Sequence, residues 1–229
     1  MTSPASTSTI RSAAFSLVEL MAVIAIIAIM MALIAPSISS FSSTAGRKGA
    51  VNILMNTLEQ ARAAALETGT DIYVLLWRRE YPDRDAIMVV REPSPWMTKS
   101  DGTKEDKLVP LTKWMPLPEG VLLHKPDRGG NVFDNTTWPA FLDQHKNEIP
   151  MPEGHSFDKS KIGYVWFAPN GSIPRPTGKE ARIVITEGVR GRGGTEAVLS
   201  GKKQQQGGFE VITLSRFTGR AQLDVTLLN

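Results

Sequence analysis

Residues 17–35 read LVELMAVIAIIAIMMALIA, and they set the architecture of the chain. Of these 19 residues 18 are apolar, and Glu19 is the one ionisable side chain among them. A helix of this length spans roughly 28 Å, at about 1.5 Å per residue, which is close to the thickness of a bilayer core. The stretch therefore predicts a transmembrane helix with a carboxylate near its N-terminal end.

The segments on either side of this stretch are polar. Residues 1–14 are small and nearly uncharged, and we expect them to be a leader. A secretory signal peptide explains them poorly, because its leader would be basic and its apolar core shorter and free of acids. After the apolar stretch, Pro36 opens the weakly helix-forming sequence PSISSFSSTAGRKG. We expect a flexible or partly irregular junction there.

An amphipathic helical pattern follows this junction. Polar side chains such as Asn52, Gln60 and Glu67 fall on one side, and Gly69 is placed to end the helix in the left-handed conformation. The simplest interpretation is one helix that is interrupted at the junction. The apolar residues at the i, i+3, i+4, i+7 spacing of a buried face are Val51, Leu54, Met55, Leu58, Ala61, Ala65 and Leu66.

From residue 71 onward the apolar pattern is that of β-strands. The last candidate strand alternates Ala221 and Leu223 with polar residues, which predicts one buried and one wet face, and Thr218-Gly219 before it predicts a hairpin turn. Residues 92–160 hold most of the prolines, and we expect long loops there. The candidate strands are 71–77, 85–91, 121–124, 164–168, 182–187, 209–215 and 221–227.

Composition excludes several kinds of site. The chain has no cysteine, which rules out disulfides and thiolate metal ligands, and its net charge of +3 does not by itself indicate a nucleic-acid-binding protein. His124, His145 and His155 are too scattered for a metal-binding helix. No segment has the pattern of a nucleophile elbow. We therefore expect no cofactor and no enzymatic activity.

The segment FSLVELMAVIAIIAI, which starts at Phe15, resembles the N-terminal segment of type IV pilins and pseudopilins, the substrates of prepilin peptidase. The resemblance implies that the chain is cut between Ala14 and Phe15 and that the new amino group of Phe15 is methylated. The family normally has glycine before the cut, so Ala14 is a departure that bears on the efficiency of cleavage.

Glu19 has two interpretations. A carboxylate costs about 2.5–3.5 kcal/mol at the centre of a bilayer and less near its edge, so Glu19 could lie near the headgroups. Alternatively, Glu19 meets a positive partner within an assembly. Cleavage before Phe15 would create an amino terminus four residues away, and the terminal amine of a neighbouring subunit would then be the partner of Glu19.

A looser similarity extends into the rest of the chain. The H-type minor pseudopilins of type II secretion and the related T-type minor fimbrial subunits have a helix similar to LEQARAAALETGTDIYVLL, residues 58–76. They also have short sheet motifs similar to WMPLPEGV (114–121), VWFAPNGSI (165–173) and ITLSRFTGRAQL (212–223), in the same order.

The resemblance implies an α+β pilin-like fold, in which a long N-terminal helix packs on a mostly antiparallel β-sheet. It divides the chain into a leader (1–14), a transmembrane and assembly helix (15–36), a junction with an amphipathic helix (37–69) and a periplasmic β-rich domain (70–229). It implies a minor structural subunit of a type II secretion pseudopilus or type IV pilus. This subunit would be anchored by a single pass in the bacterial inner membrane before assembly. The implied partners are other pilins, prepilin peptidase, an inner-membrane platform protein and its ATPase.

The alternative function is a membrane-anchored periplasmic binding module that never assembles. Such a module could bind DNA, since the chain from residue 175 onward has nine Lys/Arg against five Asp/Glu. The glycine-rich run GVRGRGGTE (188–196) lacks the Lys-Ser/Thr ending of a P-loop, and a flexible hairpin loop is its default interpretation. The candidate phosphate contacts are Arg190, Arg192, Lys202 and Lys203.

Overall fold

The structure is a computed structural model that describes residues 17–80, 83–93, 107–125, 131–133, 141–174, 181–191, 196–198 and 209–224. The chain divides into two compact units, residues 1–42 and 43–229. The second unit holds all of the described strands and the buried core.

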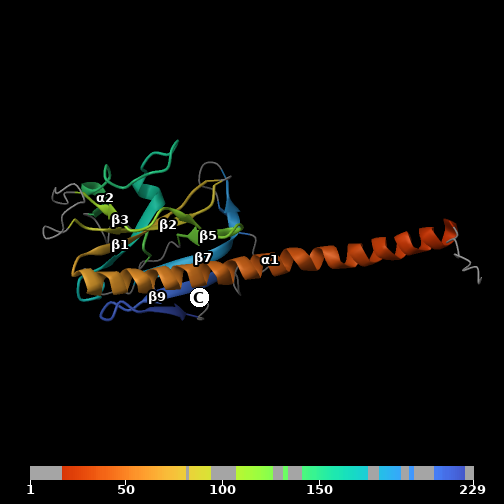
Figure 1. Cartoon of the computed structure of the whole chain (residues 1–229), viewed down its shortest axis with the longest axis horizontal. Helices are drawn as coiled ribbons and strands as arrows, with labels where there is room; N and C mark the ends of the chain where they lie inside the picture. Colours follow the sequence, from red (N-terminus) through yellow and green to blue (C-terminus); the bar gives the residue numbers. More distant parts are fainter. Residues whose placement is uncertain are drawn as a thin grey trace, which may run out of the picture. The chain divides into compact units, whose positions relative to one another are not determined.

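One helix, α1 (Leu17–Thr68), covers both predicted helical segments (Figure 1). The prediction of an irregular junction after Pro36 is therefore wrong. Proline removes a hydrogen bond and crowds the preceding turn, at a cost of about 3 kcal/mol inside a helix. Helix growth is nevertheless cooperative, because each added residue contributes one hydrogen bond, and context overrides propensity. The helix thus continues through a composition that disfavours it.

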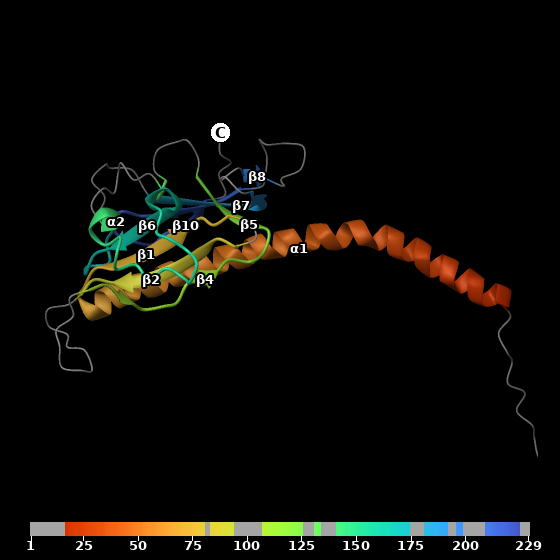
Figure 2. The same ribbon diagram turned by 90° about the horizontal axis from the view of Figure 1, so that it is seen from above.

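The C-terminal part of α1 packs one face against the sheets (Figure 2). Leu66 is 49% exposed, so its prediction as a core residue is wrong; it lies against Gly171 of a surface turn. Gly69 ends the helix as predicted, with a φ of 64° and its amide donating to the Ala65 carbonyl at 3.0 Å. The confirmed core residues of the predicted face are Val51, Leu54, Leu58, Ala61 and Ala65.

Two antiparallel sheets complete the fold, which confirms the α+β class. In the first sheet the strand order is β3-β2-β1-β6, and β4 pairs with the other part of β2. Strand β1 is central and buried along its whole length. The strands are β1 (Ile72–Trp77), β2 (Ala86–Arg91), β3 (Val109–Pro110), β4 (Met115–Pro116) and β6 (Ile162–Phe167).

The second sheet has the order β10-β9-β7-β5, with β8 paired to the far part of β7. Strands occur at all seven predicted positions of the two sheets, although residues 225–227 of the last one lie outside the described part of the chain. The strands are β5 (Val121–His124), β7 (Ala181–Arg190), β8 (Glu196–Val198), β9 (Phe209–Leu214) and β10 (Ala221–Asp224).

Strand β10 departs from its prediction in one respect. Leu223, expected on the buried face, is 42% exposed. The reason is that β10 is an edge strand, which among the described strands pairs only with β9. The predicted turn at Thr218-Gly219 is confirmed, because Gly219 has a φ of 64° and the Ser215 amide donates to the Arg220 carbonyl at 2.9 Å.

The predicted loop region, residues 92–160, contributes to the core where the structure describes it. Besides short strands it contains α2 (Phe141–Gln144) and part of the 3₁₀ turn η1 (Lys159–Lys161). The ring of Phe141 stacks on that of Tyr73 at 3.7 Å. The apolar residues of this region are isolated and follow neither the helical nor the strand spacing, so their burial cannot be predicted from the sequence pattern. Those that are buried are Leu108, Leu117, Val132, Phe133, Phe141, Leu142 and Ile149.

Candidate assembly site

The first turns of α1 expose apolar side chains on every side. Eight large side chains between Leu17 and Ile27 are 47–76% exposed. Successive helical positions are 100° apart, so residues spread over three turns cover the whole circumference. A helix that is apolar all round is stable in lipid or inside a protein assembly, because water contact with such a surface is unfavourable. This segment therefore needs a cover from outside its own unit.

The predicted processing residues lie around this segment. Ala14 and Phe15 are outside the described residues, and Glu19 is in the first turn of α1 with its side chain outside the described part. Among the described residues, no helix combines the length and the apolar character that a membrane span needs. The membrane-spanning helix stays a prediction.

Residues 46–49 of α1 attach the helix to the folded unit. A Cβ built on Gly46 would lie 3.5 Å from the Glu119 carbonyl oxygen, so the segment 118–121 packs directly against the helix backbone. Between these small residues, the Arg47 guanidinium contacts Glu187 on β7 at 2.8 Å and Glu210 on β9 at 3.3 Å. The last residues of the motif WMPLPEGV thus pack against α1.

The other three motifs meet at the end of α1. The Arg62 Nε donates to the Thr218 carbonyl at 2.6 Å. Leu66 packs on Gly171 in the turn of VWFAPNGSI, and a Cβ on Gly219 would lie 2.1 Å from the Gly171 carbonyl oxygen. The helix end, the turn at 168–172 and the β9–β10 hairpin therefore form one contact site, in which glycine is required at position 219.

A buried ion pair joins the two sheets. Arg190 on β7 contacts Asp85 at 2.5 Å, and their side chains are 3% and 0% exposed. Asp85 also accepts from the amides of Arg79 and Leu123, at 2.8 and 2.7 Å, and Arg190 donates to the carbonyls of the same two residues. Burial raises the pKa of Asp85, and the Arg190 guanidinium opposes this shift without cancelling it.

This ion pair corrects the assignment of Arg190 as a phosphate contact. Its guanidinium is enclosed and bonded within the protein, so it does not reach the surface. No local pattern in the sequence indicates this pair, because the two residues are 105 positions apart. Arg192, Lys202 and Lys203, the other candidate contacts, lie outside the described residues.

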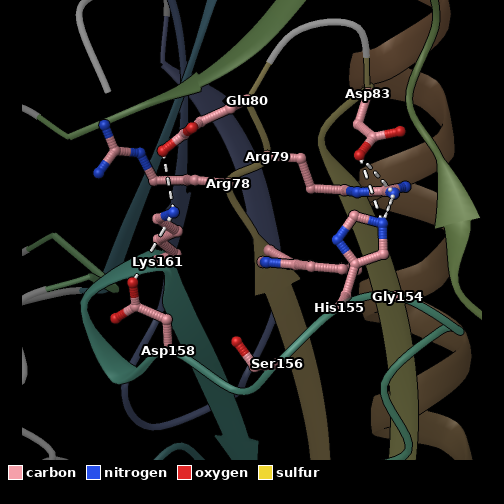
Figure 3. Close-up of a pocket in the computed structure, with 10 residues that line it drawn as sticks. Arg78, Arg79, Glu80, Asp83, Gly154, His155, Ser156, Asp158 and Lys161 are labelled. Carbon is pink, nitrogen blue, oxygen red and sulfur yellow. Dashed lines mark hydrogen bonds and ion pairs between the residues drawn. The ribbon is translucent and has the colours of Figure 1, made fainter. Parts of the chain in front are cut away.

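A polar pocket of about 430 Å³ lies between the segment after β1 and the segment 154–161 (Figure 3). On one side, Arg79 donates to His155 Nε2 at 2.9 Å and contacts Asp83 at 3.0 Å. The Arg79 guanidinium lies over the Trp77 ring, 4.5 Å from its centroid. On the other side, Lys161 contacts Glu80 at 2.9 Å and Asp158 at 3.8 Å.

The charged groups of this pocket neutralise one another. Because His155 Nε2 faces the Arg79 guanidinium, it is not placed to take a proton from a nucleophile in this arrangement. The pocket holds two segments together instead. In the described part of the chain, this pocket included, no three His, Asp or Glu side chains are grouped so that they could hold a metal ion.

Comparison with known protein families gives a match at the N-terminal segment. Residues 10–35 match the prokaryotic N-terminal methylation motif. This motif supports the general type IV pilin-like class, whose members are substrates of prepilin peptidase, and it implies interaction with that peptidase and with other pilins. It also points to a membrane-anchored form that precedes the filament. No curated protein and no solved structure matches the chain.

Proposed function

We propose that this chain is a non-enzymatic, minor structural subunit of a type II secretion pseudopilus or type IV pilus. The methylation motif at residues 10–35 is the observation that carries the proposal. Prepilin peptidase removes residues 1–14 and methylates Phe15, and the helix that follows packs the subunit among its neighbours. Before assembly the same helix anchors the chain in the bacterial inner membrane by a single pass, with the folded unit in the periplasm.

The apolar start of α1 supports this function. Its exposed side chains have no cover within residues 17–27, and lipid or neighbouring helices would both supply one. The folded unit meanwhile has its own core, to which α1 contributes from Ala50 onward. The two ends of α1 thus have different tasks: the first is available to partners and the second completes the fold.

The motifs of residues 58–76, 165–173 and 212–223 support the more specific assignment to the H-type minor pseudopilins. These segments are far apart in the sequence, yet in the structure they form one contact site around Arg62, Gly171 and Gly219. A shared contact site is a physical reason for three such segments to occur together. An inner-membrane platform protein and its ATPase are the partners that assembly of this kind needs.

Substitution of Glu19 tests the proposal. Inside a filament an unpaired carboxylate among apolar helices is costly, so pairing with a neighbour's terminal amine would act mainly to select the correct register. We expect Glu19→Ala and Glu19→Gln to be cleaved normally and to fail in crosslinking to partner pilins, with Glu19→Asp intermediate. Leader cleavage and crosslinking are measured in the same cells. Normal crosslinking of the alanine variant would show that Glu19 only lies near the headgroups and does not direct assembly.

A further inference from the structure

The tip of the β9–β10 hairpin presents a large aromatic side chain to solvent. Phe217 is 84% exposed, the highest value among the large apolar residues that the structure describes. Single exposed apolar residues are common on protein surfaces and need no explanation. Phe217 is unusual because of how its backbone is held and what surrounds it.

The backbone on both sides of Phe217 is fixed from several directions. The Arg216 carbonyl accepts from the Ile173 amide at 2.9 Å, and the Thr218 carbonyl accepts from Arg62 at 2.6 Å. Gly219 is packed so closely on the Gly171 carbonyl that no Cβ fits between them. A turn whose backbone is already fixed loses little backbone freedom on binding, which favours the use of its side chain as an anchor.

Two arginines at this tip form no ion pair within the described part of the chain. Arg216 and Arg220 are exposed, and neither makes an ion pair with any described residue. Arg62 has a weak partner, Glu59, at 3.7 Å. The Arg216 guanidinium lies 5.8 Å from the centroid of the Phe217 ring. Aromatic residues and arginine are the types that dominate the binding energy of protein interfaces.

Exposed apolar residues also occur on the elements that form this tip. In the described part of residues 43–229 there are four large ones, and Leu66 and Leu223 accompany Phe217 on the end of α1 and on the hairpin. The fourth, Leu111, lies between β3 and β4. We call the surface formed by Arg62, Leu66, Arg216, Phe217 and Arg220 the hairpin patch.

We propose that the hairpin patch docks a different subunit of the same filament, one that presents an apolar hollow edged by carboxylates. Phe217 fills the hollow, and the arginines pair with the carboxylates at its edge. A twofold contact between two copies of this chain would bring the arginines together, which like-charge repulsion opposes. The proposal rests on the function proposed above, because it assumes a filament with more than one kind of subunit.

A single cysteine placed next to Phe217 tests the proposal, since the chain has none of its own. Thr218→Cys keeps Phe217 and both arginines, and its thiol carries a photoactivatable crosslinker in cells that assemble the filament. Leu111→Cys, at another exposed site, is the matched control. We expect an adduct with one pilin subunit from position 218 and none from position 111.

Two further variants test the chemistry of the contact. Adding Phe217→Ala to the position-218 probe should lower the yield of the adduct by about tenfold or more, because the anchor is lost. Adding Arg216→Glu with Arg220→Glu should lower it by a similar factor, since like charges across an interface are strongly unfavourable. Arg216→Lys with Arg220→Lys should retain most of it. All these side chains are exposed, so the folded unit keeps its unfolding midpoint.

The outcomes separate this proposal from the function on which it rests. An uncleaved chain, or one that never crosslinks through its N-terminal helix, contradicts the function itself. A cleaved and incorporated chain that gives no adduct at position 218 contradicts only the docking surface. An adduct with nucleic acid or with a second copy of this chain would contradict the proposed partner. An adduct whose yield is unchanged by the charge reversal would contradict it as well.

Discussion

Replacing Arg190 with methionine should destabilise the folded unit strongly. The substitution leaves the Asp85 carboxylate fully buried, with two amide donors but no counter-charge, and it removes donors from the Arg79 and Leu123 carbonyls. Breaking a buried pair by removing one partner costs about 3–5 kcal/mol. With a urea dependence of about 2 kcal/mol per M, the unfolding midpoint should fall by about 2 M.

The assay is urea unfolding followed by tryptophan fluorescence, to which the buried Trp77 contributes. Arg182→Met is the control, because Arg182 is an exposed arginine on the same strand, and its midpoint should stay close to that of the parent. Replacing both partners by apolar residues, Asp85→Leu with Arg190→Met, should recover much of the loss. Equal midpoints for Arg190→Met and Arg182→Met would refute the role of the pair.

The pH dependence of the same variant follows from the direction of the Asp85 shift. Burial raises the pKa of this carboxyl in the folded state, and loss of the guanidinium raises it further. A folded-state pKa above the unfolded value means that stability falls as pH rises from the unfolded pKa through the folded one. The deficit of Arg190→Met should therefore be smallest in acid and largest at neutral pH.

Two other substitutions probe how α1 joins the fold. Gly219→Ala should lower the free energy of unfolding by more than Gly154→Ala does. Both glycines have positive φ, but only a Cβ on Gly219 would meet backbone, the Gly171 carbonyl oxygen at 2.1 Å. Equal losses would contradict the packing of the hairpin on Gly171. A chain that starts at residue 43 should be soluble and folded, whereas one that starts at residue 71 should aggregate, because it lacks Leu54 and Leu58, which are worth about 1.5–3 kcal/mol each. Equal solubility in size-exclusion chromatography would show that the helix does not complete the core.

Much of the fold could be predicted from local patterns. The helical spacing of apolar residues predicts the buried face from Val51 to Ala65, and the strand-like spacing predicts all the longer strands. Gly69 and Gly219 were found because a positive φ requires glycine at a helix end or a tight turn. These features depend on residues that are close in the chain.

The errors concern features that depend on more than the local sequence pattern. Weak propensity after Pro36 predicted a break that cooperative helix growth removes. Leu223 has the right period for a core residue, yet its strand lies at the sheet edge. The partners Asp85 and Arg190 are 105 positions apart and meet only in the folded unit, so the prediction of Arg190 as a surface phosphate contact is wrong.

The mature N-terminus decides whether the exposed helix belongs to a processed pilin-like subunit. We predict that protein from cells with active prepilin peptidase begins at N-methylated Phe15, as measured by intact mass and N-terminal peptide sequencing. Ala14→Gly should be processed at least as well, and Ala14→Lys should not be processed. Recovery of a chain that still starts at Met1 in such cells would contradict the account.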